Sequence, residues 1–146
     1  MRVSECDGRK GAGGDMLEFY IGGYAQGKLN YVLREKQQPC RVVEGEAFAP
    51  KSWEECLEGE TLVVNHFHLW VRALLRQGQS PEELLEDFLA HCPDCVIISD
   101  EVGCGIVPME REERVYRERL GRILTMVAER AERVERVICG LGQRIK

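Results

Sequence analysis

The sequence of 146 residues lacks a long apolar run. Its longest apolar segments, such as 62–64 and 95–98, are far shorter than the roughly 20 residues that span a bilayer. The chain also does not open with the apolar segment of a signal peptide. We therefore expect a cytoplasmic protein without membrane insertion.

An excess of basic residues is absent as well. The 25 Asp and Glu residues outnumber the 20 Lys and Arg residues, and the formal net charge is −5. This balance provides no extended positive surface for a polyanion, which argues against nucleic-acid binding. A small-molecule ligand is the better expectation.

The cysteine pattern of a secreted protein is missing too. The seven cysteines are an odd number scattered along the chain, and we expect reduced thiols rather than disulfides. Cys92 and Cys95 have the spacing of half a zinc site, but no second pair of ligands follows at a comparable spacing. We interpret both as buried apolar side chains at a helix-to-strand junction.

Short apolar segments alternate with helical ones along most of the chain. Residues 1–15 are polar and glycine-rich, so we expect a disordered leader there and a single domain over 16–146. We expect strands at 17–23, 40–45, 61–67, 95–102 and 134–141, and helices at 28–36, 52–59, 69–75, 80–91 and 109–134. This alternation predicts a three-layer α/β fold with a mostly parallel central sheet.

Two helices carry additional signals. Ser80, Pro81 and Glu83 predict a helix start with a capping box. Eight arginines and seven glutamates interleave within 110–136, and we interpret this charge as a solvated helix face.

A phosphate-binding loop is predicted between the first strand and the first helix. Gly22, Gly27 and Lys28 have the spacing G-x-x-x-x-G-K, in the strand–loop–helix context that this motif requires. The next position normally holds a Ser or Thr that binds Mg²⁺, and here it is leucine. The expected nucleotide-binding residues are Gly22, Gly23, Tyr24, Ala25, Gln26, Gly27, Lys28 and Leu29.

Ligands of a parallel sheet bind beyond the carboxyl ends of its strands. This rule brings 65–68, 99–105 and 140–143 to the edge that holds the loop. Asp100 and Glu101 are therefore candidate metal ligands or catalytic bases, with a polar loop start as the alternative. His66 and His68 alternate at a strand end, so they need not face the same way.

Two later segments resemble a known family. "VIISDEVGCGIVP" (96–108) precedes a long Arg/Glu-rich helix and the terminal "VICGLGQRIK" (137–146). This order of segments resembles the adenosylcobinamide kinase/adenosylcobinamide-phosphate guanylyltransferase family of cobalamin biosynthesis. The residues that match its two motifs are Gly22, Gly23, Gly27 and Lys28 in the loop, and Glu101, Val102, Gly103, Gly105 and Pro108 in the later segment, with Asp100 in place of the usual asparagine.

The resemblance implies a P-loop nucleoside-triphosphate-binding fold and a two-step chemistry. In the first step ATP or GTP phosphorylates a hydroxyl of cobinamide, and in the second a guanylyl group is transferred from GTP onto that phosphate. It also implies a small homo-oligomer. The catalytic candidates are then Lys28, Asp100 and Glu101, and the substrate-binding candidates are Asn65, His66, His68, Val102, Gly103 and Gly105.

The chain departs from the family pattern at three functional positions. Leu29 replaces the metal-binding hydroxyl, and Asn65 replaces an acidic residue. The histidine that carries the guanylyl group has no counterpart, because no histidine precedes His66. We therefore expect phosphoryl transfer without guanylyl transfer, and Mg²⁺ only if another carboxylate binds it. The alternative is a relative without catalytic activity that binds a nucleotide or a corrinoid.

Overall fold

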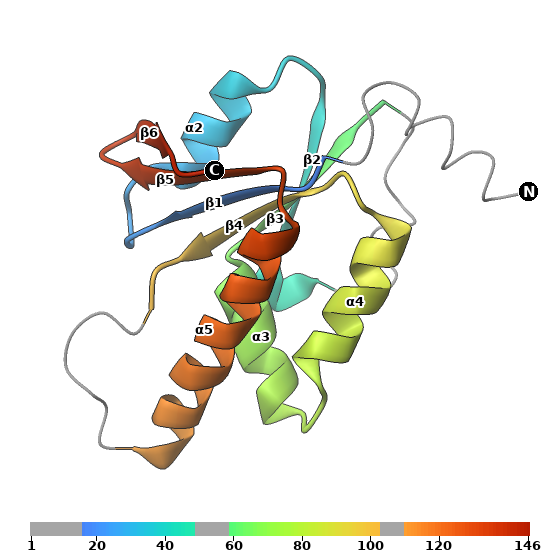
Figure 1. The fold of residues 1–146 in the computed structure, drawn as a ribbon, viewed down its shortest axis with the longest axis vertical. Coiled ribbons are helices and arrows are strands. Elements are labelled where there is room, and N and C mark those ends of the chain that lie inside the picture. The colour runs from blue at the N-terminus through green and yellow to red at the C-terminus, as the bar shows by residue number, and fades with distance from the viewer. Residues whose placement is uncertain (1–15, 49–58, 103–109) are drawn as a thin grey trace, which may run out of the picture.

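The computed structural model describes residues 16–48, 59–102 and 110–146, which form one six-stranded sheet (Figure 1). The strand order is β2-β3-β4-β1-β5-β6. The strands are β1 (Glu18–Gly22), β2 (Cys40–Glu44), β3 (Thr61–Asn65), β4 (Val96–Asp100), β5 (Arg133–Ile138) and β6 (Leu141–Arg144). All neighbouring pairs are parallel except β5 and β6, which are antiparallel. The predicted α/β class with a mostly parallel sheet is confirmed.

Helices cover both faces of this sheet. The helical elements are α2 (Lys28–Glu35), the 3₁₀ helix η1 (Gly45–Ala47), α3 (Phe67–Arg76), α4 (Pro81–His91) and α5 (Arg111–Arg130). Helix α2 packs on one face, whereas α3, α4 and α5 pack on the other (Figure 1). The described residues therefore form three layers.

The sheet is buried on both sides, which explains its continuous apolar strands. In β4, Ile97 belongs to the larger core against α3, α4 and α5, while Val96 and Ile98 belong to the smaller core under α2. Successive side chains of a strand point to opposite faces, so a central parallel strand needs apolar residues at every position.

The predicted last strand at 134–141 is wrong in part, because the chain reverses within it. Strand β5 ends at Ile138, and Leu141 then pairs antiparallel with Ile138. Cys139 and Gly140 form the two-residue turn, with φ of 50° and 75°. Such a hairpin needs positive φ at both turn residues, which asparagine and glycine signal far more clearly than cysteine.

The other strands and the helices at 28–36, 69–75 and 80–91 are confirmed as elements, but the strand predicted at 61–67 ends at Asn65 because α3 begins at Phe67. The helix predicted at 109–134 is confirmed as α5, but it ends at Arg130, and Arg133 and Val134 belong to β5. The predicted helix at 52–59 lies outside the described residues, apart from Gly59.

The predicted capping box at the start of α4 is wrong. Ser80 occupies the N-cap position and Pro81 the first turn, but the Ser80 side chain makes no capping hydrogen bond. It bonds the Glu82 carboxylate instead.

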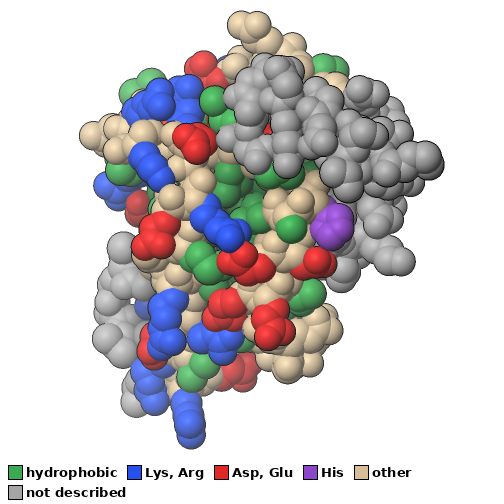
Figure 2. Space-filling view, turned by 45° about the vertical axis from the view of Figure 1, so that its right-hand side comes forward, with side chains coloured by type: hydrophobic (Ala, Val, Ile, Leu, Met, Phe, Trp, Pro, Cys, Tyr) green, Lys and Arg blue, Asp and Glu red, His purple; other side chains and the backbone are tan. Residues whose placement is uncertain are grey.

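Charged side chains of α5 interleave on the surface, as predicted (Figure 2). Several also connect helices. Arg119 binds Glu82 of α4 through two hydrogen bonds of 3.0 and 2.7 Å, and Arg130 binds Glu86 at 2.7 Å. The charge is therefore a solvated face that also ties α5 to α4.

The cysteines of the described ranges are free thiols, and Cys92 and Cys95 are buried as predicted. Among the helices of these ranges, none has both the length and the apolar character needed to cross a membrane.

Candidate functional site

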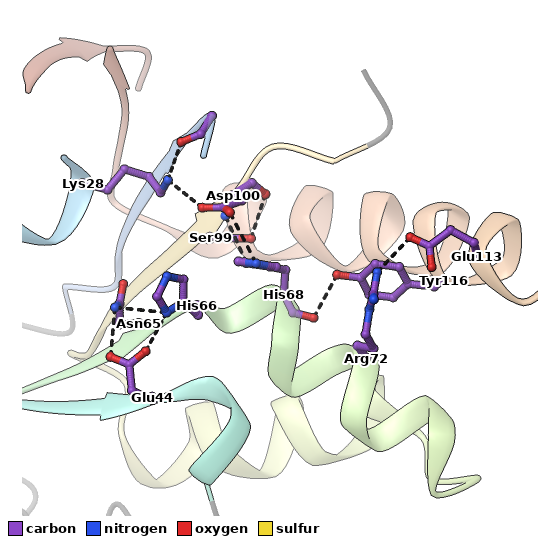
Figure 3. Close-up of polar contacts among 11 residues, drawn as sticks. Lys28, Glu44, Asn65, His66, His68, Arg72, Ser99, Asp100, Glu113 and Tyr116 are labelled. Atoms are coloured by element: carbon purple, nitrogen blue, oxygen red, sulfur yellow. Dashed lines mark hydrogen bonds and ion pairs between the residues drawn. The ribbon is translucent and has the colours of Figure 1, made fainter. Parts of the chain in front are cut away.

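The carboxyl ends of β1, β3 and β4 meet at one edge of the sheet. Gly22 lies opposite Asp100 in the β1–β4 register, and β3 ends beside β4 at Asn65. Side chains from these strand ends and from α2 and α3 converge there (Figure 3). The predicted edge is thus the place where the candidate residues gather.

The glycines of the predicted loop are required by its geometry. A Cβ on Gly22 would lie 2.4 Å from the backbone oxygen of Val137, so only glycine allows β1 to approach β5 this closely. Gly27 has φ of 79° and precedes α2 as its N-cap, without a capping side chain. The first amides of α2 are therefore available to an anion.

The hairpin turn between β5 and β6 holds this loop. The amide of Gly140 donates to the backbone oxygen of Gln26 at 2.8 Å, and the amide of Cys139 donates to the Gln26 side-chain oxygen at 2.7 Å. These contacts could not be predicted from the sequence, which does not signal the turn at Cys139 and Gly140.

The Lys28 ammonium lies over the loop. Its Nζ donates to the backbone oxygen of Gly23 at 2.7 Å and lies 2.7 Å from Oδ1 of Asp100. The Lys28 side chain is only 7% exposed. The amine therefore faces the end of β4 across the loop.

His68 contacts the same Asp100 from α3. The Asp100 amide donates to His68 Nδ1 at 3.2 Å, and His68 Nε2 lies 3.5 Å from Asp100 Oδ2. Burial lowers the pKa of His68, and the nearby Asp100 charge only partly opposes this. The ring is therefore neutral with its proton on Nε2, and Asp100 lies between Lys28 and His68.

A second polar cluster contains Glu44, Asn65 and His66. Asn65 Nδ2 donates to Glu44 Oε2 at 3.0 Å, and His66 Nδ1 lies 2.6 Å from Glu44 Oε1. Burial raises the pKa of Glu44, but the hydrogen bonds from Asn65 and His66 outweigh it and hold the pKa below its usual value. Glu44 is therefore an ionised acceptor for both side chains.

Glu44 is a residue of the site that was not predicted from the sequence. It is the last residue of β2, and it lies opposite Asn65 in the β2–β3 register. Its position as an acidic residue at the end of a predicted parallel strand was the available signal.

The remaining candidates take different positions. The Glu101 amide donates to the Gly22 backbone oxygen at 2.8 Å, and its carboxylate pairs with Arg136 at 2.8 and 3.2 Å. Tyr24, one of the expected nucleotide-binding residues, is 84% exposed, so its ring does not pack against the core.

Leu29 and Val102 are partly buried against the two cores. Ala25 lies in the loop with φ of 57°. Gly103 and Gly105 lie outside the described residues.

The site offers one carboxylate to a metal ion beside the loop lysine. No group of three or more His, Cys, Asp and Glu side chains with the geometry of a metal site occurs within the described ranges. Mg²⁺ is commonly bound by only one or two carboxylates together with substrate phosphates. Asp100, at the end of β4, fits that requirement.

A parallel sheet whose first strand leads through a glycine loop to a lysine and a helix is the arrangement of phosphate-loop proteins. The family model for cobinamide kinase / cobinamide phosphate guanyltransferase matches residues 33–145. The chain belongs to this family. The match begins after the glycine loop, so the loop assignment depends on its own geometry.

Three curated relatives agree with this assignment. The bifunctional adenosylcobalamin biosynthesis protein CobP of Pseudomonas aeruginosa is 29% identical over 126 residues, which cover 73% of each chain. The CobU proteins of Escherichia coli and Salmonella typhimurium are 36% and 35% identical over 81 residues, or 53% of this chain. Those matches span 44% of each CobU relative.

Proposed function

We propose that this protein binds ATP or GTP at the loop 22–28 and transfers the terminal phosphoryl group to a hydroxyl of adenosylcobinamide. The observation that carries the proposal is the Lys28 ammonium, which lies over the loop 2.7 Å from the Gly23 backbone oxygen. Loop amides, the start of α2 and one ammonium together form an anion-binding arrangement.

Phosphoryl transfer depends mainly on positioning and on neutralising charge, so few protein groups are needed. We assign Asp100 as the residue that would hold Mg²⁺ beside the phosphates. The resemblance expects an acid at position 65 and an asparagine at position 100, and this chain has Asn65 and Asp100. The acid and the asparagine have thus changed places between the ends of β3 and β4. Since these strands are neighbours, one acidic side chain remains at the same edge of the sheet. Mg²⁺ would neutralise the charge of the transferred group.

We do not extend the proposal to guanylyl transfer. In the family that step needs a histidine for which this chain has no counterpart before His66. We expect a small homo-oligomer in the cytoplasm, with a nucleotide and a corrinoid as its ligands.

A second candidate is a binding protein without turnover. Leu29 provides no metal-binding hydroxyl, and Lys28 is already paired with Asp100 at 2.7 Å. Both features favour retention of phosphate binding with loss of catalysis.

A transfer assay separates the two candidates. Wild-type protein is mixed with γ-labelled ATP or GTP, Mg²⁺ and adenosylcobinamide, and labelled corrinoid is measured. The kinase proposal expects labelled product from the wild type and none from Lys28→Met, while Lys146→Met, which changes a lysine at the far end of the chain, remains active. Nucleotide binding without any labelled corrinoid would support the binding protein instead.

A further inference from the structure

The Glu44–His66 pair has the geometry of a catalytic base. Glu44 is ionised, and a carboxylate can only accept a hydrogen bond, so Nδ1 of His66 must carry the proton in the 2.6 Å contact. With Nδ1 as the donor to Glu44, Nε2 is the ring nitrogen that can accept a proton. Among the described residues, the polar contacts of the His66 ring with Glu44 and Asn65 are both made at Nδ1, and with the proton there the 2.6 Å contact to Glu44 is the hydrogen bond.

The backbone fixes this ring at the site. His66 has φ of 53°, an uncommon conformation for a residue other than glycine, and it precedes α3 as its N-cap. Gly45 packs against it, because a Cβ there would lie 2.1 Å from the His66 backbone oxygen. Backbone conformations of this kind concentrate at functional sites.

His66 lies next to the phosphate-binding groups. Its ring meets the His68 ring edge-on, with 5.7 Å between centroids, and His68 contacts Asp100, which contacts Lys28 (Figure 3). His68 has no comparable lone pair, since its Nδ1 accepts the Asp100 amide. The His66 side chain is 42% exposed and therefore accessible to a substrate.

We propose that His66, oriented by Glu44, is the general base that accepts the proton of the substrate hydroxyl during phosphoryl transfer. The inference rests on the proposed function. The hydroxyl oxygen forms a bond to the terminal phosphorus, the bond from that phosphorus to the bridging oxygen breaks, and its electron pair leaves with the nucleoside diphosphate. The hydroxyl proton moves to Nε2 of His66, and the Glu44 carboxylate stabilises the resulting imidazolium.

The test uses His66→Gly, because glycine adopts positive φ without strain and leaves space for added imidazole. General-base catalysis is worth about 10²–10⁴-fold, so single-turnover transfer to adenosylcobinamide should slow by about that factor. Added imidazole should restore part of the rate. Nucleotide affinity, measured by calorimetry, should stay within about twofold of wild type, since the polar contacts of the His66 ring among the described residues are with Glu44 and Asn65 and not with the loop.

Two further variants complete the test. Glu44→Gln keeps an acceptor for His66 but removes the charge that stabilises the imidazolium, and we expect about tenfold slower transfer with normal nucleotide affinity. His91→Ala is the matched control, because His91 also contacts an acidic residue, Asp87, but lies on α4 at the surface. It should transfer at the wild-type rate.

Transfer by His66→Gly at the wild-type rate would overturn the base role and leave the proposed function intact. A loss of transfer that imidazole does not restore, or that comes with weaker nucleotide binding, would assign His66 a structural role and also overturn it. A wild-type protein that transfers no phosphate would contradict the proposed function itself, and the base role with it.

Discussion

Replacing Asp100 with asparagine removes one negative charge beside the phosphate loop while keeping the shape of the side chain. In the structure Asp100 Oδ1 lies 2.7 Å from Lys28 Nζ, and the Asp100 side chain is 14% exposed. If Lys28 also contacts a nucleotide phosphate, the carboxylate and the phosphate share one ammonium. The variant should therefore bind metal-free nucleotide more tightly.

The structure gives the size of this effect. A phosphate oxygen hydrogen-bonded to the same Nζ lies at most about 5.5 Å from Oδ1 of Asp100. Two unit charges at about 5.5 Å repel by about 3 kcal/mol at an effective dielectric constant of about 20. Salt and solvent at this partly open edge reduce the repulsion. If about half of it remains, about 1.5 kcal/mol, removing it should strengthen binding about tenfold.

Calorimetric titration with ATP and GTP, each with EDTA or with Mg²⁺, measures both parts of the prediction. Asp100→Asn should bind metal-free nucleotide at least about tenfold more tightly than wild type, and Mg²⁺ should improve its binding less than it improves that of wild type. Thermal unfolding of the variant provides the control for an intact fold. Equal metal-free affinities and an equal Mg²⁺ effect in both proteins would refute the reasoning.

Three further predictions address the loop and its support. Leu29→Ser restores the missing hydroxyl and should raise Mg²⁺-dependent transfer at least about tenfold, whereas an unchanged rate would contradict the metal role of this position. Gly22→Ala places a Cβ 2.4 Å from a backbone oxygen of β5, so it should lower the unfolding free energy by about 1–3 kcal/mol and weaken nucleotide binding. Gly121→Ala has open space around its new Cβ and should instead stabilise α5 by about 0.5–1 kcal/mol. Equal stability of these two variants would argue against the close approach. Tyr31→Phe removes the donor at 2.6 Å to buried Glu135 and should cost about 1–3 kcal/mol in chemical denaturation at pH 7. The hydrogen bond to Glu135, aided by burial, raises the pKa of Tyr31 from 10.0 to about 12. The free energy that this bond adds to folding is therefore complete below pH 10 and is lost as the pH rises through 12. If the wild type and Tyr31→Phe lose the same unfolding free energy over this pH range, the reasoning is wrong.

Much of the fold could be predicted because apolar patterning reports burial directly. A strand such as β4 is apolar at successive positions since it is covered on both faces, and the phosphate loop combines a fixed glycine–lysine spacing with a strand before it and a helix after it. The hairpin at Cys139 and Gly140 could not be predicted, because cysteine carries no turn signal and Leu141 continues the apolar pattern.

The site could be predicted only as far as strand ends define it. The rule for parallel sheets brings Asp100 to the loop, but it does not state that Asp100 pairs with Lys28. The Glu44–His66 pair depends on the β2–β3 register and on a left-handed conformation at His66. Neither can be read from residue types, since a long-range register is set by packing and histidine seldom adopts positive φ.

The central claim is that the loop 22–28 binds nucleotide phosphates with Lys28 as the charge that contacts them. Its most direct test is a calorimetric titration of the wild type and of Lys28→Met/Asp100→Asn with GTP and ATP. The double variant removes both members of the ion pair, so no unpaired buried charge remains to destabilise the fold. We predict saturable binding by the wild type and a loss of at least about tenfold in the folded double variant. Equal binding by both proteins, or none by the wild type, would contradict the account.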